Sequence, residues 1–336
     1  MNILFDHPFP FALAHGGLQT QIQQTKTALE SIGVDVDFVR WWDEGQEGNL
    51  LHFFGRPAGQ YIQLAHQKRR RVVLAELLGG LGARGPFARA AQRTLITLAQ
   101  RFLPADLRAR LAWDAYRKAD ACVALTSWEG HLMTTMFSAP PDRVQVVPNG
   151  VEPVFVNSIS AARGPWLVCT ATITEVKRVV ELAEAALTAQ TPLWVIGRAF
   201  DNGLDYPRKF FGLARQNPKL IRYEGPLQDR AALARAYREA RGFVLLSRWE
   251  TLSIAALEAA ACECPLLLSD LPWARSVFGD QASYCPATRN RDGTARALRT
   301  FYDRAPDLPK PPKPKTWLEV AQQLKSIYES LLSRPW

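Results

Sequence analysis

Short apolar runs alternate along the chain with longer segments in which apolar residues recur every three or four positions. The short runs are typical of buried strands, and the longer pattern is typical of helices that pack on one face. The expected strands of the first half are 1–5, 35–40, 50–54, 71–74, 121–125 and 144–147. Those of the second half are 166–170, 192–196, 220–223, 243–246 and 265–269. This order predicts an α/β protein with doubly wound parallel sheets.

Two breaks in the pattern divide the chain. Residues 153–165 read as a hinge and predict one domain over 1–152 and a second over 153–316. The stretch PDLPKPPKPKT, residues 306–316, is too rich in proline to be helical. After it, residues 317–332 have apolar positions at helical spacing and predict a last helix.

The most informative chemistry lies at a strand-to-helix junction in the second half. The expected strand 243–246 leads through a loop over 247–251 into an alanine-rich helix that should begin near Leu252. Backbone N–H groups at a helix start carry partial positive charge and bind phosphates. A diphosphate is therefore expected to rest on the amides of Thr251, Leu252 and Ser253.

Two glutamates flank this junction eight positions apart. Glu258 lies about 9 Å along the helix from its start, so its carboxylate could accept hydrogen bonds from two ribose hydroxyls. Glu250 would stay beside the sugar. On this interpretation Glu258 faces a ligand and its removal should spare the fold. The alternative is that Glu250 is a solvated loop acid and Glu258 a helix surface acid.

The spacing resembles the E-x(7)-E motif of family-4 glycosyltransferases, which are retaining enzymes with the GT-B fold. Further segments resemble that family in the same order: HGGLQTQIQQTKTALESIGVDVDFV (15–39), VQVVPNGVEPVF (144–155), TATITEVKR (170–178) and PLWVIGRAFDN (192–202). The resemblance implies two Rossmann-like domains that face a cleft. It also implies that 1–152 binds the acceptor, that 153–316 binds the donor, and that 317–336 crosses back onto the first domain.

The resemblance assigns donor contacts to several further residues. Lys177 matches the family's phosphate-binding lysine and would offset the charge that builds on the leaving diphosphate. The family usually has an arginine where Thr172 stands, and Arg178 or Arg198 would have to replace it. Gly16 and Gly17 would let the backbone approach a ligand, as would Gly197, or they only shape a turn.

The acceptor side departs from the family pattern. Glu76 stands where relatives often carry a histidine near the reacting sugar carbon, which makes it a candidate catalytic residue that changes the local charge. His15 and His52 are candidate acceptor contacts, although a histidine at a strand end is more often structural.

The resulting functional prediction is a retaining, metal-independent hexosyltransferase. It would use a nucleotide diphosphate sugar, no cofactor, and a glycan, lipid-linked or small-molecule acceptor of cell-surface polysaccharide or glycolipid synthesis. The one Asp-x-Asp pair, Asp35 and Asp37, lies in an alternating strand and is expected to face solvent rather than hold a metal. The five cysteines form no CxxC pair and are expected to be buried thiols.

Three alternatives stay open. A GT-B protein could bind sugar nucleotides without transferring them, as the departures at Thr172 and Glu76 would allow. A sugar-nucleotide epimerase shares the fold but needs catalytic acids that the sequence does not place. An NAD-dependent oxidoreductase is the remote alternative, because GLGARG at 80–85 matches a dinucleotide fingerprint, although late in its domain.

Charge is concentrated in one region. Residues 68–120 hold twelve Lys or Arg against four Asp or Glu, within a net charge of +9. Residues 86–103 mix arginines with apolar positions, as an amphipathic helix on an anionic membrane would, or as one packed on its own core. No aromatic-interleaved basic motif suggests nucleic acid. Without a basic N-terminal leader or an 18-residue apolar run, a cytoplasmic protein is expected, with peripheral membrane contact if the first reading holds.

Overall fold

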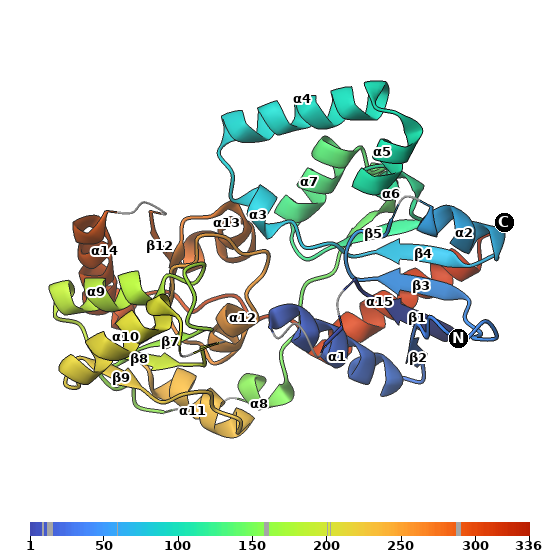
Figure 1. Ribbon diagram of the computed structural model, residues 1–336. Helices are drawn as coiled ribbons and strands as arrows, with labels where there is room; N and C mark the ends of the chain where they lie inside the picture. The colour runs from blue at the N-terminus through green and yellow to red at the C-terminus, as the bar shows by residue number, and fades with distance from the viewer. Residues whose placement is uncertain are drawn as a thin grey trace. The chain divides into compact units, whose positions relative to one another are not determined.

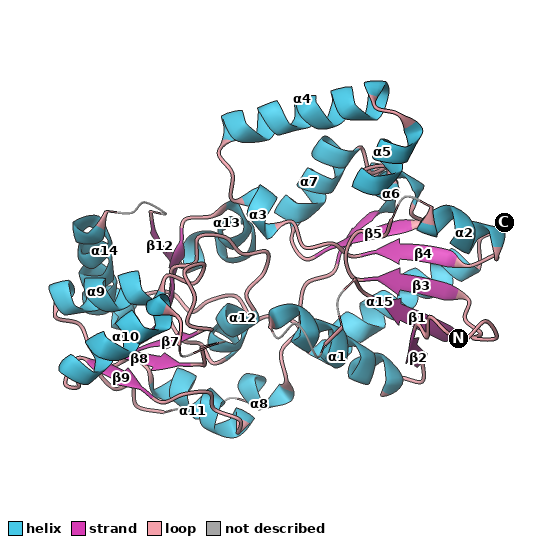
Figure 2. Ribbon diagram, viewed as in Figure 1, coloured by secondary structure: helices cyan, strands magenta, loops and turns pink. Residues whose placement is uncertain are grey.

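The computed structural model describes residues 1–8, 10–11, 16–58, 60–157, 161–199, 201, 203–286 and 290–336. It divides into two compact units. Unit 1 comprises Met1–Gly150 with Lys315–Trp336, and unit 2 comprises Val151–Pro314. These bounds lie within two residues of the domain limits expected from the sequence. Each unit is built on one parallel sheet flanked by helices (Figure 2).

Unit 1 contains a six-stranded parallel sheet in the order β2-β1-β3-β4-β5-β6. Its strands are β1 (Asn2–Asp6), β2 (Asp35–Phe38), β3 (Leu50–Phe53), β4 (Arg71–Leu74), β5 (Ala121–Ala124) and β6 (Val144–Val146). Each is shorter than, or shifted by one residue from, the apolar run that predicted it, apart from β4, which matches it. The α/β class is confirmed.

The helices of unit 1 cover both faces of this sheet. They are α1 (Gly17–Glu30), α2 (Tyr61–Gln67), α3 (Gly79–Gly82), α4 (Pro86–Phe102), α5 (Ala105–Leu111), α6 (Ala115–Lys118), α7 (Ser127–Phe137) and α15 (Trp317–Leu332). One core contains Leu4, Leu51, Val72 and Leu74 from the strands, with residues of α2, α4, α6 and α7. The GLGARG segment forms the single turn α3 after β4, where Gly82 packs on Trp128, so it is not the first strand-to-helix turn of a dinucleotide domain.

Helix α15 completes unit 1 from the other end of the chain, with the bounds that the apolar spacing predicted. It packs along α1 (Figure 1). Thr316 and Glu319 form a reciprocal capping box at its start. Its buried face includes Trp317, Val320 and Tyr328, so apolar burial holds this terminal segment in unit 1.

Unit 2 repeats the architecture with a parallel sheet in the order β12-β11-β10-β7-β8-β9. Its strands are β7 (Leu167–Thr170), β8 (Leu193–Ile196), β9 (Ile221–Tyr223), β10 (Gly242–Leu245), β11 (Leu266–Ser269) and β12 (Ser283–Cys285). Sequence reasoning missed β12, because its three residues form no apolar run. The helices are α8 (Pro153–Val156), α9 (Val179–Ala189), α10 (Asp205–Gln216), α11 (Arg230–Glu239), α12 (Ile254–Ala261), α13 (Pro272–Phe278) and α14 (Arg291–Arg304).

Both sheets reverse their strand order once. In unit 2 the chain runs from β7 outward through β8 and β9, then returns to the other side of β7 with β10. In unit 1 the reversal falls between β1 and β3. At such a point neighbouring loops leave the carboxyl ends of the strands in opposite directions and open a ligand crevice. The loops after β7 and β10 are therefore expected to border a ligand site.

Candidate functional site

At the reversal in unit 2, Lys177 and Glu250 form an ion pair. Lys177 lies in the turn between β7 and α9, and Glu250 lies in the loop between β10 and α12. Ser247 donates a second hydrogen bond to the same Glu250 oxygen at 3.0 Å. The two side chains, which the sequence analysis placed at the diphosphate and beside the sugar of a donor, are direct neighbours, although they are separated by 73 positions.

The two loops are also tied through Arg248. Its backbone N–H donates to the Val176 carbonyl at 2.7 Å. Its guanidinium lies 3.8 Å from the Glu175 carboxylate and 3.5 Å from that of Glu181. Sequence reasoning missed Arg248, which stands two positions before Glu250. This network fixes the loop after β7 against the loop after β10 and holds the ammonium group of Lys177 at the reversal.

Gly197 ends β8 in a conformation that only glycine suits. Its φ is +151°, and a Cβ there would lie 1.9 Å from the Ala171 carbonyl oxygen. The Gly197 N–H donates to the Gly225 carbonyl at 2.8 Å, and the Gly197 carbonyl accepts from the Tyr223 hydroxyl at 3.0 Å. This glycine therefore has a packing role whatever it binds. Arg198 beside it is exposed at the same edge of the sheet.

Glu258 is not the helix surface acid of the second sequence interpretation. It is buried rather than on a helix surface, and its carboxylate accepts hydrogen bonds from Arg230 and from the Tyr237 hydroxyl, the latter at 3.2 Å. Arg230 also pairs with Glu152 and lies over the Phe155 ring. Burial raises the pKa of Glu258, and Arg230 and Tyr237 offset this only in part.

This burial argues against the expectation that Glu258 could be removed with little effect on the fold. Both oxygens already have protein partners, so a ribose would have to compete with Arg230 for the carboxylate. Sequence reasoning missed Arg230, because nothing local marks a residue 28 positions away as the partner.

The helix start also differs in detail. Helix α12 begins at Ile254, two residues later than expected, because the Ser253 hydroxyl caps it by accepting from the Ala256 N–H at 3.3 Å. Thr251 and Leu252 precede the cap, and Leu252 is buried. Thr172 is partly buried in the loop after β7. Arg178 is buried at a positive φ of 54°, which leaves its guanidinium little access to a phosphate.

The glycine pair of unit 1 lies at the start of α1. Gly16 precedes the helix with φ of +154°, which favours glycine, and a Cβ on either Gly16 or Gly17 would meet no atom of the described residues within 4 Å. The space above both residues is therefore open rather than packed. His15 lies outside the described residues.

Glu76 follows β4 and is held in a two-pronged ion pair. The Arg56 Nε and Nη2 atoms donate to its two oxygens at 2.8 and 2.9 Å, and the Tyr116 hydroxyl donates to one of them. The acid that replaces the family histidine is thus compensated by a cation after β3. Sequence reasoning missed Arg56, because Glu76 is 20 positions away.

A second carboxylate of unit 1 also escaped sequence reasoning. Glu129 is buried in the first turn of α7, where its oxygens accept the backbone N–H groups of Leu78 and Leu125 at 2.7 Å each. Burial raises the pKa of Glu129 to about 7, although these two donors lower it. The carboxylate ties the segment after β4 to the segment after β5, which is a structural role.

The burial of His52 argues against the acceptor contact that the sequence analysis expected. The imidazole is buried inside unit 1, stacked on Phe54, with Nδ1 2.6 Å from the Tyr328 hydroxyl of α15. Burial lowers the pKa of His52 to about 3. All four residues of β3 are buried, and the role of His52 is to pack the last helix on the sheet.

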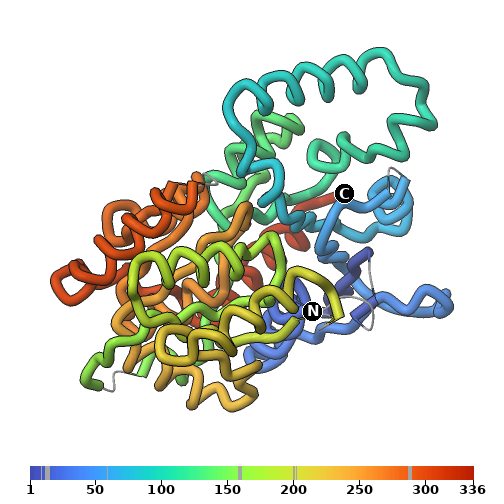
Figure 3. Tube along the Cα trace, turned by 60° about the vertical axis from the view of Figure 1, so that its left-hand side comes forward, coloured from blue at the N-terminus to red at the C-terminus, as the bar shows by residue number. Residues whose placement is uncertain are grey.

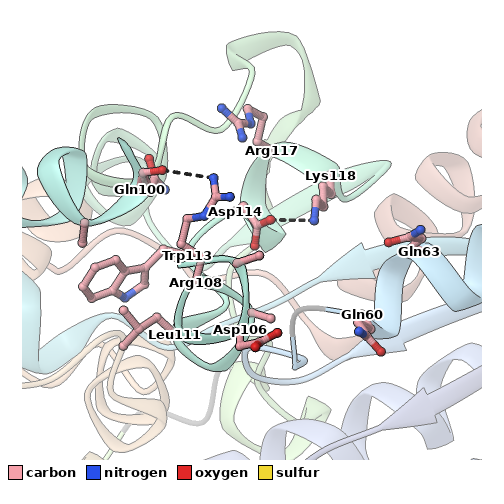
Figure 4. Close-up of a pocket in the computed structure, with 13 residues that line it drawn as sticks. Gln60, Gln63, Gln100, Asp106, Arg108, Leu111, Trp113, Asp114, Arg117 and Lys118 are labelled. Carbon is pink, nitrogen blue, oxygen red and sulfur yellow. Dashed lines mark hydrogen bonds and ion pairs between the residues drawn. The ribbon is translucent and has the colours of Figure 1, made fainter. Parts of the chain in front are cut away.

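Unit 1 also has a polar pocket of about 350 Å³ beside α5 (Figure 4). Its wall includes Arg108, which donates to the Gln100 carbonyl at 3.3 Å, and Lys118, which pairs with Asp114 at 2.5 Å. Arg117 lines it as well. None of these residues was expected to form a site.

Comparison with known proteins assigns part of the chain to a sequence family model. Residues 164–304 match the model described as Glycosyl transferases group 1. A D-inositol 3-phosphate glycosyltransferase from Actinosynnema mirum is 27% identical over 176 residues, 45% of this chain and 41% of that protein. One from Kribbella flavida is 29% identical over 175 residues, 44% and 40% of the two chains. The match thus spans about two fifths of the length of these relatives.

Solved structures match almost the whole chain. Sucrose-phosphate synthase from Thermosynechococcus elongatus aligns with a TM-score of 0.69 over 99% of both chains at 16% identity. Anabaena Alr3699/HepE, solved with UDP and glucose, aligns with a TM-score of 0.62 over 98% of this chain and 99% of that one at 14% identity. The chain has the GT-B fold.

Within this GT-B chain, the second sheet carries the region that matches the family model. Lys177, Glu250 and Glu258 all fall inside it. None of the helices in the described part of this GT-B chain is long and apolar enough to cross a membrane. Asp35 is exposed, as expected, whereas Asp37 accepts hydrogen bonds from Arg40 and Gln46.

Proposed function

We propose that this chain is a retaining glycosyltransferase that moves a hexose from a nucleoside diphosphate sugar to an acceptor without a metal ion. The observation that supports it most is the Lys177–Glu250 pair at the strand reversal of unit 2. The matches to the glycosyltransferase family model and to structures solved with UDP agree with it. Nothing in the proposed reaction requires a cofactor.

In this proposal Lys177 exchanges partners when the donor binds. Its ammonium group leaves Glu250 for the diphosphate and stabilises the negative charge that grows there as the bond from C1 to the phosphate oxygen breaks. The acceptor oxygen bonds to C1 on the face that the diphosphate leaves, and its proton passes to a phosphate oxygen. Glu250, held by Ser247, then faces the sugar hydroxyls. Retention follows because attack and departure share one face.

We further propose that the amides of Thr251, Leu252 and Ser253, with Gly197 and Arg198, line the phosphates, and that Glu258 binds the ribose once Arg230 is displaced. In unit 1, Gly16 and Gly17 would contact the donor through their backbone, and Glu76, whose charge Arg56 balances, would act near the reacting sugar carbon. A glycan, lipid-linked or small-molecule acceptor of cell-surface polysaccharide or glycolipid synthesis fits this arrangement.

The first experiment tests donor binding and turnover together. UDP, GDP and ADP are screened for a rise in melting temperature, because a ligand that binds only the folded state stabilises it. The matching UDP-, GDP- and ADP-sugars are then assayed for transfer and hydrolysis. We expect one base to raise the melting temperature and its sugar to be consumed. No shift with any nucleotide would contradict the proposal.

The second experiment uses two lysines that each pair with a glutamate in unit 2. Lys177→Ala should lower kcat by roughly 10²–10³-fold, since it removes one charged donor to the leaving group. Lys209→Ala breaks the exposed pair with Glu184 and should leave kcat unchanged. Equal activity in both variants would remove Lys177 from the reaction.

A second candidate function is sugar-nucleotide binding without transfer. It is favoured by the ion pairs that already occupy Lys177, Glu258 and Glu76, and by Thr172 where the family has a cation. A nucleotide-induced rise in melting temperature with no turnover on any acceptor would select this function.

A further inference from the structure

Helix α4 exposes four large apolar side chains to solvent. Phe87, Leu95, Leu98 and Phe102, which we call the α4 stripe, are all exposed, Phe87 by 91% and Phe102 by 70%. At 3.6 residues per turn they fall within an arc of about 80°. An exposed apolar stripe along about 22 Å of one helix is costly in water unless something covers it.

The opposite side of α4 is the one that packs on unit 1. Ile96 belongs to the core, and Arg89 lies 4.9 Å over the Trp128 ring of α7. Figures 1 and 3 both show α4 at the outside of unit 1. The helix is therefore amphipathic, but it is not packed on its own core by its apolar face, so the second of the two sequence interpretations does not hold for this stripe.

The charge around the stripe is predominantly positive. Helix α4 contains Arg89, Arg93 and Arg101 and no acidic residue. Residues 84–118 hold eight Lys or Arg against two Asp. Helix α5, which follows, exposes Leu107 and Leu111 next to Arg108 and Arg110. The polar pocket beside it adds Arg117 and Lys118 (Figure 4).

This charge argues for one kind of occupant. Two copies of the chain joined through the α4 stripe would bring their arginines together, which costs free energy. An anionic lipid surface covers apolar side chains with acyl chains and meets the arginines with phosphates. We propose that α4 and α5 dock unit 1 on an anionic bilayer, with the α4 stripe at the acyl boundary. The proposal does not depend on the transferase reaction.

The first test is flotation of the full chain with lipid vesicles. We expect binding to vesicles with about 30 mol% phosphatidylglycerol in phosphatidylcholine and weaker binding to phosphatidylcholine alone. Binding to the anionic vesicles should weaken when NaCl rises from about 50 to about 500 mM. Leu98→Ser with Phe102→Ser should weaken binding at least about tenfold at both salt concentrations. The matched control, Leu64→Ser with Leu318→Ser, removes exposed apolar residues of unit 1 elsewhere and should bind as the unchanged chain does.

Two double variants with reversed charges measure the electrostatic contribution to vesicle binding. Arg101→Glu with Arg110→Glu should weaken binding at low salt much more than at high salt. Lys219→Glu with Lys313→Glu makes the same change in net charge on exposed residues of unit 2 and should have little effect. Equal losses in the two pairs would mean that only net charge matters, and this would overturn docking through α4 and α5.

The third test follows the helix itself. All five cysteines are buried, so Leu98→Cys offers a selective site for an environment-sensitive dye. We expect its emission to shift to the blue with anionic vesicles, and a dye at Leu318→Cys to stay unchanged. Unchanged melting temperatures confirm that the variants fold. The proposal would be overturned if the stripe variant bound vesicles as well as the unchanged chain does. It would also be overturned if the unchanged chain bound no vesicles and formed a dimer that the stripe variant does not form.

Discussion

At the scale of single residues, the charged side chains near the ends of the strands are already engaged within the protein. Lys177 pairs with Glu250, Glu258 with Arg230, and Glu76 with Arg56. A ligand must therefore replace existing ion pairs rather than fill vacant ones. Such an exchange has a low net cost where the pair is partly exposed, as at Lys177, and a higher cost where it is buried, as at Glu258.

Glu258→Ala should lower the free energy of unfolding by about 3 kcal/mol, because it leaves the buried Tyr237 hydroxyl and the Arg230 guanidinium without this carboxylate. Asp303→Ala, which breaks an exposed pair with Arg299 in the same unit, should cost less than about 1 kcal/mol. Urea unfolding measures both. A Glu258 variant as stable as the Asp303 variant would contradict the buried pair.

His52 should make the protein less stable as the pH falls. Its folded pKa of about 3 lies below the unfolded value of 6.5, so the unfolded state binds more protons between these limits. The contribution of His52 to the free energy of unfolding should drop by about 2 kcal/mol between pH 7 and pH 5. Urea unfolding at several pH values tests this, with His52→Gln as reference. An equal pH dependence in both proteins would place the imidazole in water.

At the scale of elements, the apolar patterns of the sequence predicted most strands and the last helix closely, because both depend on local periodicity. Strand β12 was missed because Ser283 and Tyr284 give no apolar signal, and its formation depends on pairing with β11. Helix α12 begins later than predicted because the Ser253 cap outweighs the helix propensity of the alanine-rich segment. The direction in which α4 turns its apolar stripe also could not be predicted, because the same pattern suits a core or a membrane.

Thr316→Ala should lower the free energy of unfolding by about 1 kcal/mol, since it removes the hydroxyl of the capping box at α15. Thr97→Ala, on the exposed side of α4, is a matched control that removes a hydroxyl bonded only within its own helix. Thermal unfolding compares the two variants. Equal melting temperatures would mean that the capping box does not stabilise α15.

At the scale of the whole molecule, two parallel sheets of six strands, with different strand orders, each depend on their own core. Unit 1 needs a segment from the far end of the chain, since residues 315–336 supply the helix that buries Trp317, Val320 and Tyr328. The sequence analysis expected the last helix to cross back onto the first domain only because the chain resembles GT-B proteins.

Removal of residues 315–336 should destabilise unit 1 and spare unit 2. The truncation exposes the apolar surface beneath α15 and leaves the buried His52 without Tyr328, whereas Val151–Pro314 keeps its own core. Limited proteolysis should then degrade residues before 150 and leave a resistant fragment near 151–314. A truncated chain in which both units resist protease equally would contradict the division.

The sequence by itself determined the α/β class, the positions of most strands and of the last helix, and the loops that carry Lys177 and Glu250. These follow from periodicity, capping and spacing, which act over a few residues. Only the tertiary structure decided the partners of the charges, the burial of His52 and Glu258, and the outward face of α4. Those depend on contacts between residues far apart in the chain, such as the 276 positions between His52 and Tyr328, and local sequence carries no record of them.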